Sequence, residues 1–130
     1  MMFTAYGVAA AAILGAAAGA AASRGLAGKR TPKAYIVTEV EITGDHEAYQ
    51  RDYAAHAAST VEPFDGHYLA RGGRVLGTEG DPPKARVVIS EFPSFEAARD
   101  WRYSPAYTKI VTVRLRESNS RQYIVEGTGE

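Results

Sequence analysis

The order of strand-like and helix-like segments after residue 33 constrains the fold more than any other feature of this sequence. Stretches rich in β-branched residues predict strands, and apolar residues recurring every three or four positions predict helices. Asp45, Ser94 and Ser104 stand where helix caps are expected. The expected strands are 34–42, 67–71, 85–92 and 122–125, and the expected helices are 45–63, 94–103 and 104–117. The order β-α-β-β-α-β predicts a ferredoxin-like α+β domain, a four-stranded antiparallel sheet with helices on one face.

Apolar residues on both alternations of three strands predict that neither face of the sheet is left to water. Adjacent side chains of a strand point to opposite faces, because the side-chain period is two residues. The adjacent apolar pairs are Ile36 and Val37, Val88 and Ile89, and Ile124 and Val125. Helices cover one face, so the other needs a partner, and a second copy of the chain is the simplest one. The sequence thus predicts self-association through the sheet face, as in a dimeric α/β barrel.

Several long strings in residues 34–127 carry a family resemblance. They are AYIV at 34–37, GHYLARGG at 66–73, EFPSFEAARDW at 91–101, SPAY at 104–107, and Arg114 followed by Ser120-Arg121 and Glu126-Gly127. On these strings the sequence resembles domain-of-unknown-function family 1330, within the dimeric α/β-barrel superfamily. The resemblance implies the fold and the dimer, and it implies no reaction. Typical members begin at the first strand, so the segment before residue 33 is an addition to the family pattern.

The N-terminal segment 1–23 differs sharply in composition from the domain 34–127. Residues 5–22 form an eighteen-residue apolar run rich in alanine and glycine. At about 1.5 Å per helical residue the run reaches roughly 27 Å, enough to cross a bilayer core. Basic residues at Arg24, Lys29 and Arg30 follow it, and the positive-inside rule then places the domain on the cytoplasmic side. This interpretation makes the chain a single-pass membrane protein.

Small residues recur every four positions within the apolar run, which lays them along one face of a helix. They are Gly7, Ala11, Gly15 and Gly19, and this spacing is typical of transmembrane helices that pack closely against other helices. Membrane-protein partners are therefore expected through this face. The alternative is a cleaved signal peptide ending in the small residues Ala20-Ala21-Ala22, which would export a soluble domain to the periplasm. Residues 24–33 are interpreted as a linker.

Composition excludes several classes of function. The sequence has no cysteine, which excludes disulfides, thiolate metal sites and cysteine nucleophiles. Fifteen basic and fifteen acidic residues cancel, so nothing favours nucleic acid as a partner. His46, His56 and His67 are scattered along the chain and predict no metal site. No nucleophile motif or phosphate-binding loop is present, so no cofactor is expected.

Charged residues within the expected strands form the one candidate pocket. Glu39 and Glu91 continue apolar alternations, and Arg71 lines up with His67 at a spacing of four residues. If these alternations face one apolar cleft, the four side chains could bind a small polar ligand or form a structural ion pair, because buried charges persist only when they are paired. Trp101 and Tyr107 flank the helix break at Ser104-Pro105 and could wall the pocket mouth or pack in the core.

Three hypotheses of function follow. The first is a membrane-tethered, non-catalytic binding domain or accessory subunit of a membrane complex. The second is a cofactor-independent enzyme of the monooxygenase or isomerase kind, in which Arg71 and Glu91 orient a substrate and His67 acts as base. The third is an exported soluble homodimer.

Overall fold

The computed structural model describes residues 30–130. The segment 1–23, predicted as a membrane anchor or a signal peptide, lies outside this range, and so does the stripe of Gly7, Ala11, Gly15 and Gly19 within it. Residues 24–29 of the predicted linker 24–33 lie outside it as well. Among the described residues, no helix combines the length and the apolar character that crossing a bilayer requires.

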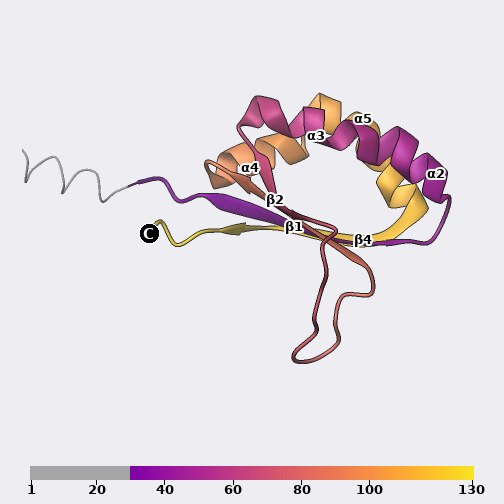
Figure 1. Cartoon of the computed structure of the whole chain (residues 1–130). Coiled ribbons are helices and arrows are strands. Elements are labelled where there is room, and N and C mark those ends of the chain that lie inside the picture. The colour runs from indigo at the N-terminus through magenta and orange to yellow at the C-terminus, as the bar shows by residue number, and fades with distance from the viewer. Residues whose placement is uncertain (1–29) are drawn as a thin grey trace, which may run out of the picture. The chain divides into compact units, whose positions relative to one another are not determined.

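Four antiparallel strands form a sheet in the order β2-β3-β1-β4, with helices on one face (Figure 1). The strands are β1 (Ala34–Ile42), β2 (His67–Arg71), β3 (Arg86–Phe92) and β4 (Ser118–Glu126). The central strand β1 pairs with both β3 and β4, and β2 pairs with β3. The ferredoxin-like prediction is therefore confirmed. We call the face under the helices the covered face and the other the open face.

The predicted helix 45–63 has the expected extent but contains a wider turn. It consists of α2 (His46–Tyr49), the π-helical turn η1 (Gln50–Ala54), α3 (Ala55–Val61) and the 3-10 turn η2 (Glu62–Phe64). The helical segment between β3 and β4 consists of α4 (Phe95–Arg102) and α5 (Pro105–Glu117), which are separated by two residues. A π turn changes the angular spacing of the residues that follow it, and such turns are frequent at functional sites.

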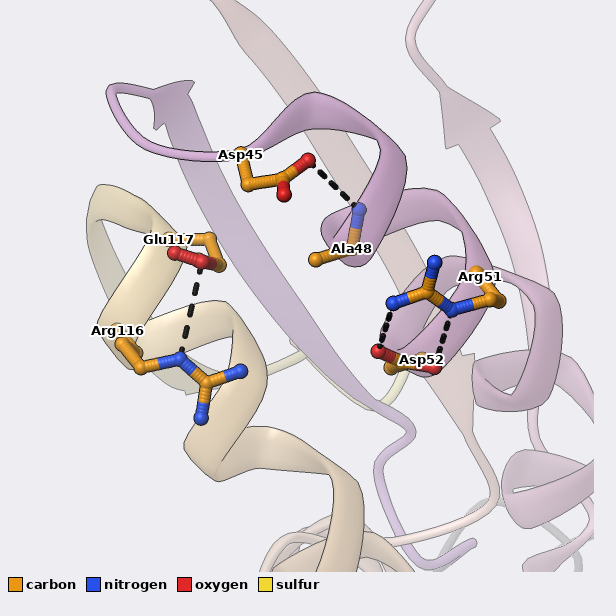
Figure 2. A network of polar contacts seen from close by, with 6 residues as sticks. All are labelled: Asp45, Ala48, Arg51, Asp52, Arg116 and Glu117. Carbon is orange, nitrogen blue, oxygen red and sulfur yellow. Dashed lines mark hydrogen bonds and ion pairs between the residues drawn. The ribbon is translucent and has the colours of Figure 1, made fainter.

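The three predicted helix caps are all formed. The carboxylate of Asp45 accepts a hydrogen bond from the backbone N–H of Ala48 at 3.0 Å (Figure 2). Ser94 and Ser104 cap α4 and α5 in the same way through their hydroxyl oxygens. Pro105 then occupies the first position of α5, where its missing N–H is harmless. These caps fix the residue at which each helix begins.

Ion pairs near the first helix join residues adjacent in the sequence. Arg51 contacts Asp52 at 2.9 Å, and Arg116 contacts Glu117 at 3.7 Å (Figure 2). The hydrogen bond from Arg51 lowers the pKa of Asp52 below its usual value. Exposed pairs of this kind contribute little to stability and do not form a site.

The hydrophobic core lies between the covered face and the helices. Along β1 the covered positions are buried, from Ala34 at 0% exposed to Val40 at 3%. Aromatic side chains from the helices pack on them, including Tyr49, Tyr53 and Trp101. Phe92 and Trp101 lie with ring centroids 5.5 Å apart. Of the two apolar alternations of β1, the one that contains Ile36 and Val40 therefore builds the core.

Two sequence predictions at the C-terminal end need correction. The last strand was predicted over 122–125, but β4 begins at Ser118, directly after α5, and its first residue pairs with Ile42. The polar residues 118–120 were interpreted as a loop that ends the preceding helix. They belong to β4 instead, because their backbone groups pair with those of β1. The apolar residues Tyr107, Ile110, Val111 and Leu115 recur at spacings of three and four, which predicts one buried face for helix 104–117. Leu115 is nevertheless 55% exposed, and Arg114 is buried in its place.

Candidate functional site

Glu91 is the centre of a small charged cluster on the open face. Its Oε1 atom lies 3.1 Å from Lys33 Nζ and 3.2 Å from His67 Nε2. His67 stands directly opposite Glu91 in the β2–β3 ladder, and the Glu91 side chain is only 12% exposed. The structure thus brings together two of the predicted site residues, Glu91 and His67.

Glu39 lies elsewhere on the same open face, paired with another partner. Its carboxylate accepts a hydrogen bond from the Nε atom of Arg121, which stands directly opposite on β4. This hydrogen bond raises the pKa of Arg121. In the β1–β3 ladder Val37 and Ile89 lie between Glu39 and Glu91, so the two carboxylates do not share one cluster.

Arg71 was predicted to share a face with His67 and lies instead on the covered face. Strict alternation would place the two side chains together, but the β2–β3 register shifts between Tyr68 and Ala70. A bulge adds one residue, so every later side chain of the strand changes face. Arg71 therefore pairs with Val88, a covered position, and its Nη2 donates to the carbonyl oxygen of Ala54 at 3.1 Å. The predicted four-residue constellation does not form.

A cavity lies between the sheet and the helix that contains η1, and Arg71 lies at its rim. Its volume is about 30 Å³. It is lined from all four strands and from the helical segments α2, η1, α3 and α4. The polar and aromatic lining residues are Thr38, Tyr49, Tyr53, Tyr68, Arg71, Arg86, Ser90, Trp101 and Gln122. We call it the covered pocket. None of its lining residues is Asp, Glu or His.

Tyrosine hydroxyls give the covered pocket its polar character. Burial raises the pKa of Tyr49, Tyr53 and Tyr68, so all three phenols are neutral near pH 7. Arg86 and Arg71 act in the opposite direction on Tyr49, because their positive charge stabilises an anion nearby. Arg71 also lies over the ring of Tyr68, 4.5 Å from its centroid. The lining of the pocket is thus aromatic, its tyrosines are uncharged near pH 7, and its two arginines make the electrostatic potential positive.

Trp101 and Tyr107 have different positions relative to this pocket. Trp101 lines it, and its Nε1–H donates to the hydroxyl of Thr60 at 3.0 Å. Tyr107 is fully buried behind Trp101, with ring centroids 4.0 Å apart, and its hydroxyl is 2.6 Å from that of Tyr53. Tyr107 is therefore a core residue, and Trp101 is both core and pocket wall.

The family model of DUF1330, a domain of unknown function, matches residues 33–128. The chain belongs to the DUF1330 family. No curated protein matches the sequence. A crystal structure of a protein of unknown function from Rhodopseudomonas palustris is 21% identical, with a TM-score of 0.59, and the match covers 75% of this chain and 83% of that one.

Two further solved structures share the fold of this DUF1330 domain. SnoaB, a cofactor-independent oxygenase from Streptomyces nogalater, is 17% identical with a TM-score of 0.50, covering 73% of this chain and 92% of that one. A conserved protein of unknown function from Bacteroides thetaiotaomicron is 8% identical with a TM-score of 0.50, covering 74% and 98%. At these identities the likeness shows the fold alone.

Sequence reasoning missed two arginines of this DUF1330 domain that lie on the covered side. Arg86 begins β3 opposite Val40, a buried position, and its Nε atom is buried without a hydrogen-bond partner. Arg114 is 1% exposed. The signal for Arg114 was present, because Tyr107, Val111 and Arg114 follow one another at spacings of four and three on the buried face of α5. Among the described residues, no group of three His, Asp or Glu side chains could hold a metal ion.

Proposed function

We propose that this DUF1330 domain binds a small aromatic molecule in the covered pocket and acts as a binding or accessory subunit. The observation that carries the proposal is the convergence of Tyr49, Tyr53, Tyr68 and Trp101 on one cavity that has arginine at its rim. Such apolar cavities with a few polar groups are typical ligand sites. The pocket lining contains no carboxylate or imidazole to act as a base near pH 7, which favours binding over catalysis.

The volume of the pocket sets a condition on binding. At about 30 Å³ the cavity has room for about two water molecules, whereas ligand sites usually exceed about 300 Å³. A ligand therefore has to displace the helical cover. Tyr49, Tyr53 and Ala54 line the pocket at or beside the π turn η1, where the hydrogen-bond ladder of the helix is irregular. We place the opening at this turn.

Trp101 provides a direct assay, because it is the single tryptophan of the chain and lines the pocket. Titration of the full-length protein with a panel of naphthols and hydroquinones should change its fluorescence. Ala57→Leu fills the pocket and should abolish the change, whereas Ala55→Leu, at an exposed position of the same helix, should leave it intact. A folded Ala57→Leu protein that binds as tightly as the wild type would refute the proposal.

Cofactor-independent oxygenation is the second candidate. It is favoured by the fold shared with SnoaB and by the positive field of Arg71 and Arg86, which would stabilise the anion of a bound phenol or enol. A phenol or enol that loses its proton to water before it binds needs no base from the protein, and its electron-rich anion can react with O₂ directly. Oxygen uptake that depends on the same naphthol panel, and that Ala57→Leu removes, would establish it. Binding without oxygen uptake would leave the binding function alone.

Pairing with a second copy through the open face is a further part of the proposal. Val37 and Ile89 are half-buried there, and Tyr123 and Val125 are each 47% exposed. A partner sheet would remove this apolar surface from water. Analytical ultracentrifugation should show a dimer that Val37→Lys dissociates, whereas Thr112→Lys, at an exposed position of α5, should not.

Membrane tethering is proposed from the sequence alone. It rests on the apolar run 5–22 and the basic residues that follow it. The mass of the protein isolated from its native cells decides between an anchor and a cleaved signal. A mass corresponding to residues 1–130 in the membrane fraction supports the tethered accessory subunit, and a mature start near Ser23 supports the exported homodimer.

A further inference from the structure

A second hollow lies on the covered side, at the free edge of β4, and the proposed function does not use it. It is a groove between α4, α5 and β4 with a volume of about 350 Å³, within the range of small-molecule sites. Its lining includes Arg102, Tyr103, Arg114, Leu115, Ser120 and Gln122. We call it the edge groove.

Arg114 in the edge groove is a buried cation with too few partners. It is 1% exposed, and its Nη1 donates to the hydroxyl of Ser120. Its Nε atom is buried without a hydrogen-bond partner, and its guanidinium lies 5.8 Å from the ring centroid of Tyr53. A guanidinium has five N–H donors, and burying its charge is costly unless an anion compensates it. Neither a serine hydroxyl nor a neutral phenol carries that charge.

Arg102 adds a second cation to the same groove. Its Nε donates to the amide oxygen of Gln122 at 2.8 Å, and Gln122 in turn donates to Thr38 at 2.9 Å. This chain of hydrogen bonds holds the Arg102 side chain in place. Within residues 30–130, no carboxylate lies within 4.0 Å of either guanidinium, although other arginines of the domain do have carboxylate partners.

The outer part of the edge groove is apolar. Tyr103 is 73% exposed and Leu115 is 55% exposed, and both are large side chains that line the groove. Isolated exposed apolar residues need no explanation, but here they flank a pair of cations without anionic partners. A ligand that complements both the arginines and the apolar outer part of the groove carries a negative group at one end and an apolar group at the other.

We propose that the edge groove binds a small organic acid, with its carboxylate held by Arg114 and Arg102 and its apolar part lying against Tyr103 and Leu115. A planar guanidinium binds a carboxylate through two parallel hydrogen bonds, which suits the unused donors of Arg114. The acid supplies the missing counter-charge, so occupation of the groove stabilises the folded domain.

Isothermal titration of the full-length protein with benzoate tests the proposal. Benzoate should bind and raise the melting temperature. Benzyl alcohol has the ring without the charge, and inorganic phosphate has the charge without the ring, so each should bind at least about tenfold more weakly. Equal binding of benzoate and phosphate would show a site for anions in general and would overturn the assignment to organic acids.

Variants locate the binding in the edge groove rather than in the covered pocket. Leu115→Glu places a negative charge at the outer wall and should weaken benzoate binding about tenfold or more, whereas the neutral Leu115→Gln should have a smaller effect. Arg99→Gln removes an exposed arginine that already pairs with Asp100, and should not change binding. Benzoate binding that survives Leu115→Glu, or falls equally in Arg99→Gln, would overturn the proposal.

Arg114→Met separates a binding role from a structural one. Replacing an uncompensated buried charge by an apolar side chain is often neutral or stabilising. We therefore expect the ligand-free variant to melt at or above the wild-type temperature and to bind benzoate about ten to a hundred times more weakly. A lower melting temperature together with unchanged benzoate binding would show that Arg114 serves the fold and not a ligand.

Discussion

The hydroxyl pair of Tyr53 and Tyr107 offers the sharpest test of how the helices are held over the sheet. The two oxygens lie 2.6 Å apart, and the residues are 8% and 0% exposed. Changing either tyrosine to phenylalanine leaves the other hydroxyl buried without a partner, which costs about 1–3 kcal/mol. The double change removes both hydroxyls, so it should cost less than the sum of the single changes, with a coupling of about 1 kcal/mol.

Urea unfolding of the wild type, both single variants and the double variant measures this coupling. Each kcal/mol lost should also lower the melting temperature by about 4–8 °C for a domain of this size. Tyr103→Phe is the control, because Tyr103 is 73% exposed, and its effect should stay within about 0.5 kcal/mol. If the single effects add without coupling, the two hydroxyls do not bond to each other and the reasoning fails.

Further predictions concern ionisation, packing and capping, and urea midpoints measure each of them. Burial, followed by the proximity of Tyr107, raises the pKa of Tyr53, while an unfolded tyrosine ionises near pH 10. The ionisation of Tyr53 should therefore leave stability unaffected below about pH 10 and lower it above by about 1.4 kcal/mol per pH unit. Burial also raises the pKa of Tyr49 and Tyr68, so the slope of the wild type is steeper, and Tyr53→Phe should reduce it by the share of Tyr53. Gly66→Ala places a Cβ atom 2.5 Å from the Phe92 ring and should cost about 1–3 kcal/mol. Asp45→Ala removes the α2 cap and should cost about 1 kcal/mol.

The fold could be predicted because its signals are local and agree with one another. The β-branched residues Ile36, Val37 and Val40 identified β1, whereas its apolar residues on both alternations left open which face the helices cover. Ser94 and Ser104-Pro105 identified the starts of α4 and α5 through the capping chemistry that the structure shows. Each of these signals needs only a few neighbouring residues, so sequence reasoning was sufficient.

The candidate site could not be predicted because it depends on one non-local irregularity. The bulge between Tyr68 and Ala70 changes the face of Arg71, and no glycine or proline marks it in the sequence. A bulge depends on how β2 meets β3, which a single strand does not reveal. The π turn η1 is similar, since its residues are ordinary helix formers and their position over the sheet becomes visible only in three dimensions.

The sheet separates the charges of the domain, and this separation bears on both binding proposals. On the open face Glu91 and Glu39 are paired with cations. On the covered side Arg71, Arg86 and Arg114 have no carboxylate within ion-pair distance in the described part of the chain. The chain as a whole has zero net charge, so its composition does not reveal that these arginines on the covered side have no carboxylate partner. Because buried charge is costly without compensation, both proposals assign the missing negative charge to a ligand: an acid in the edge groove, or an ionisable phenol in the covered pocket.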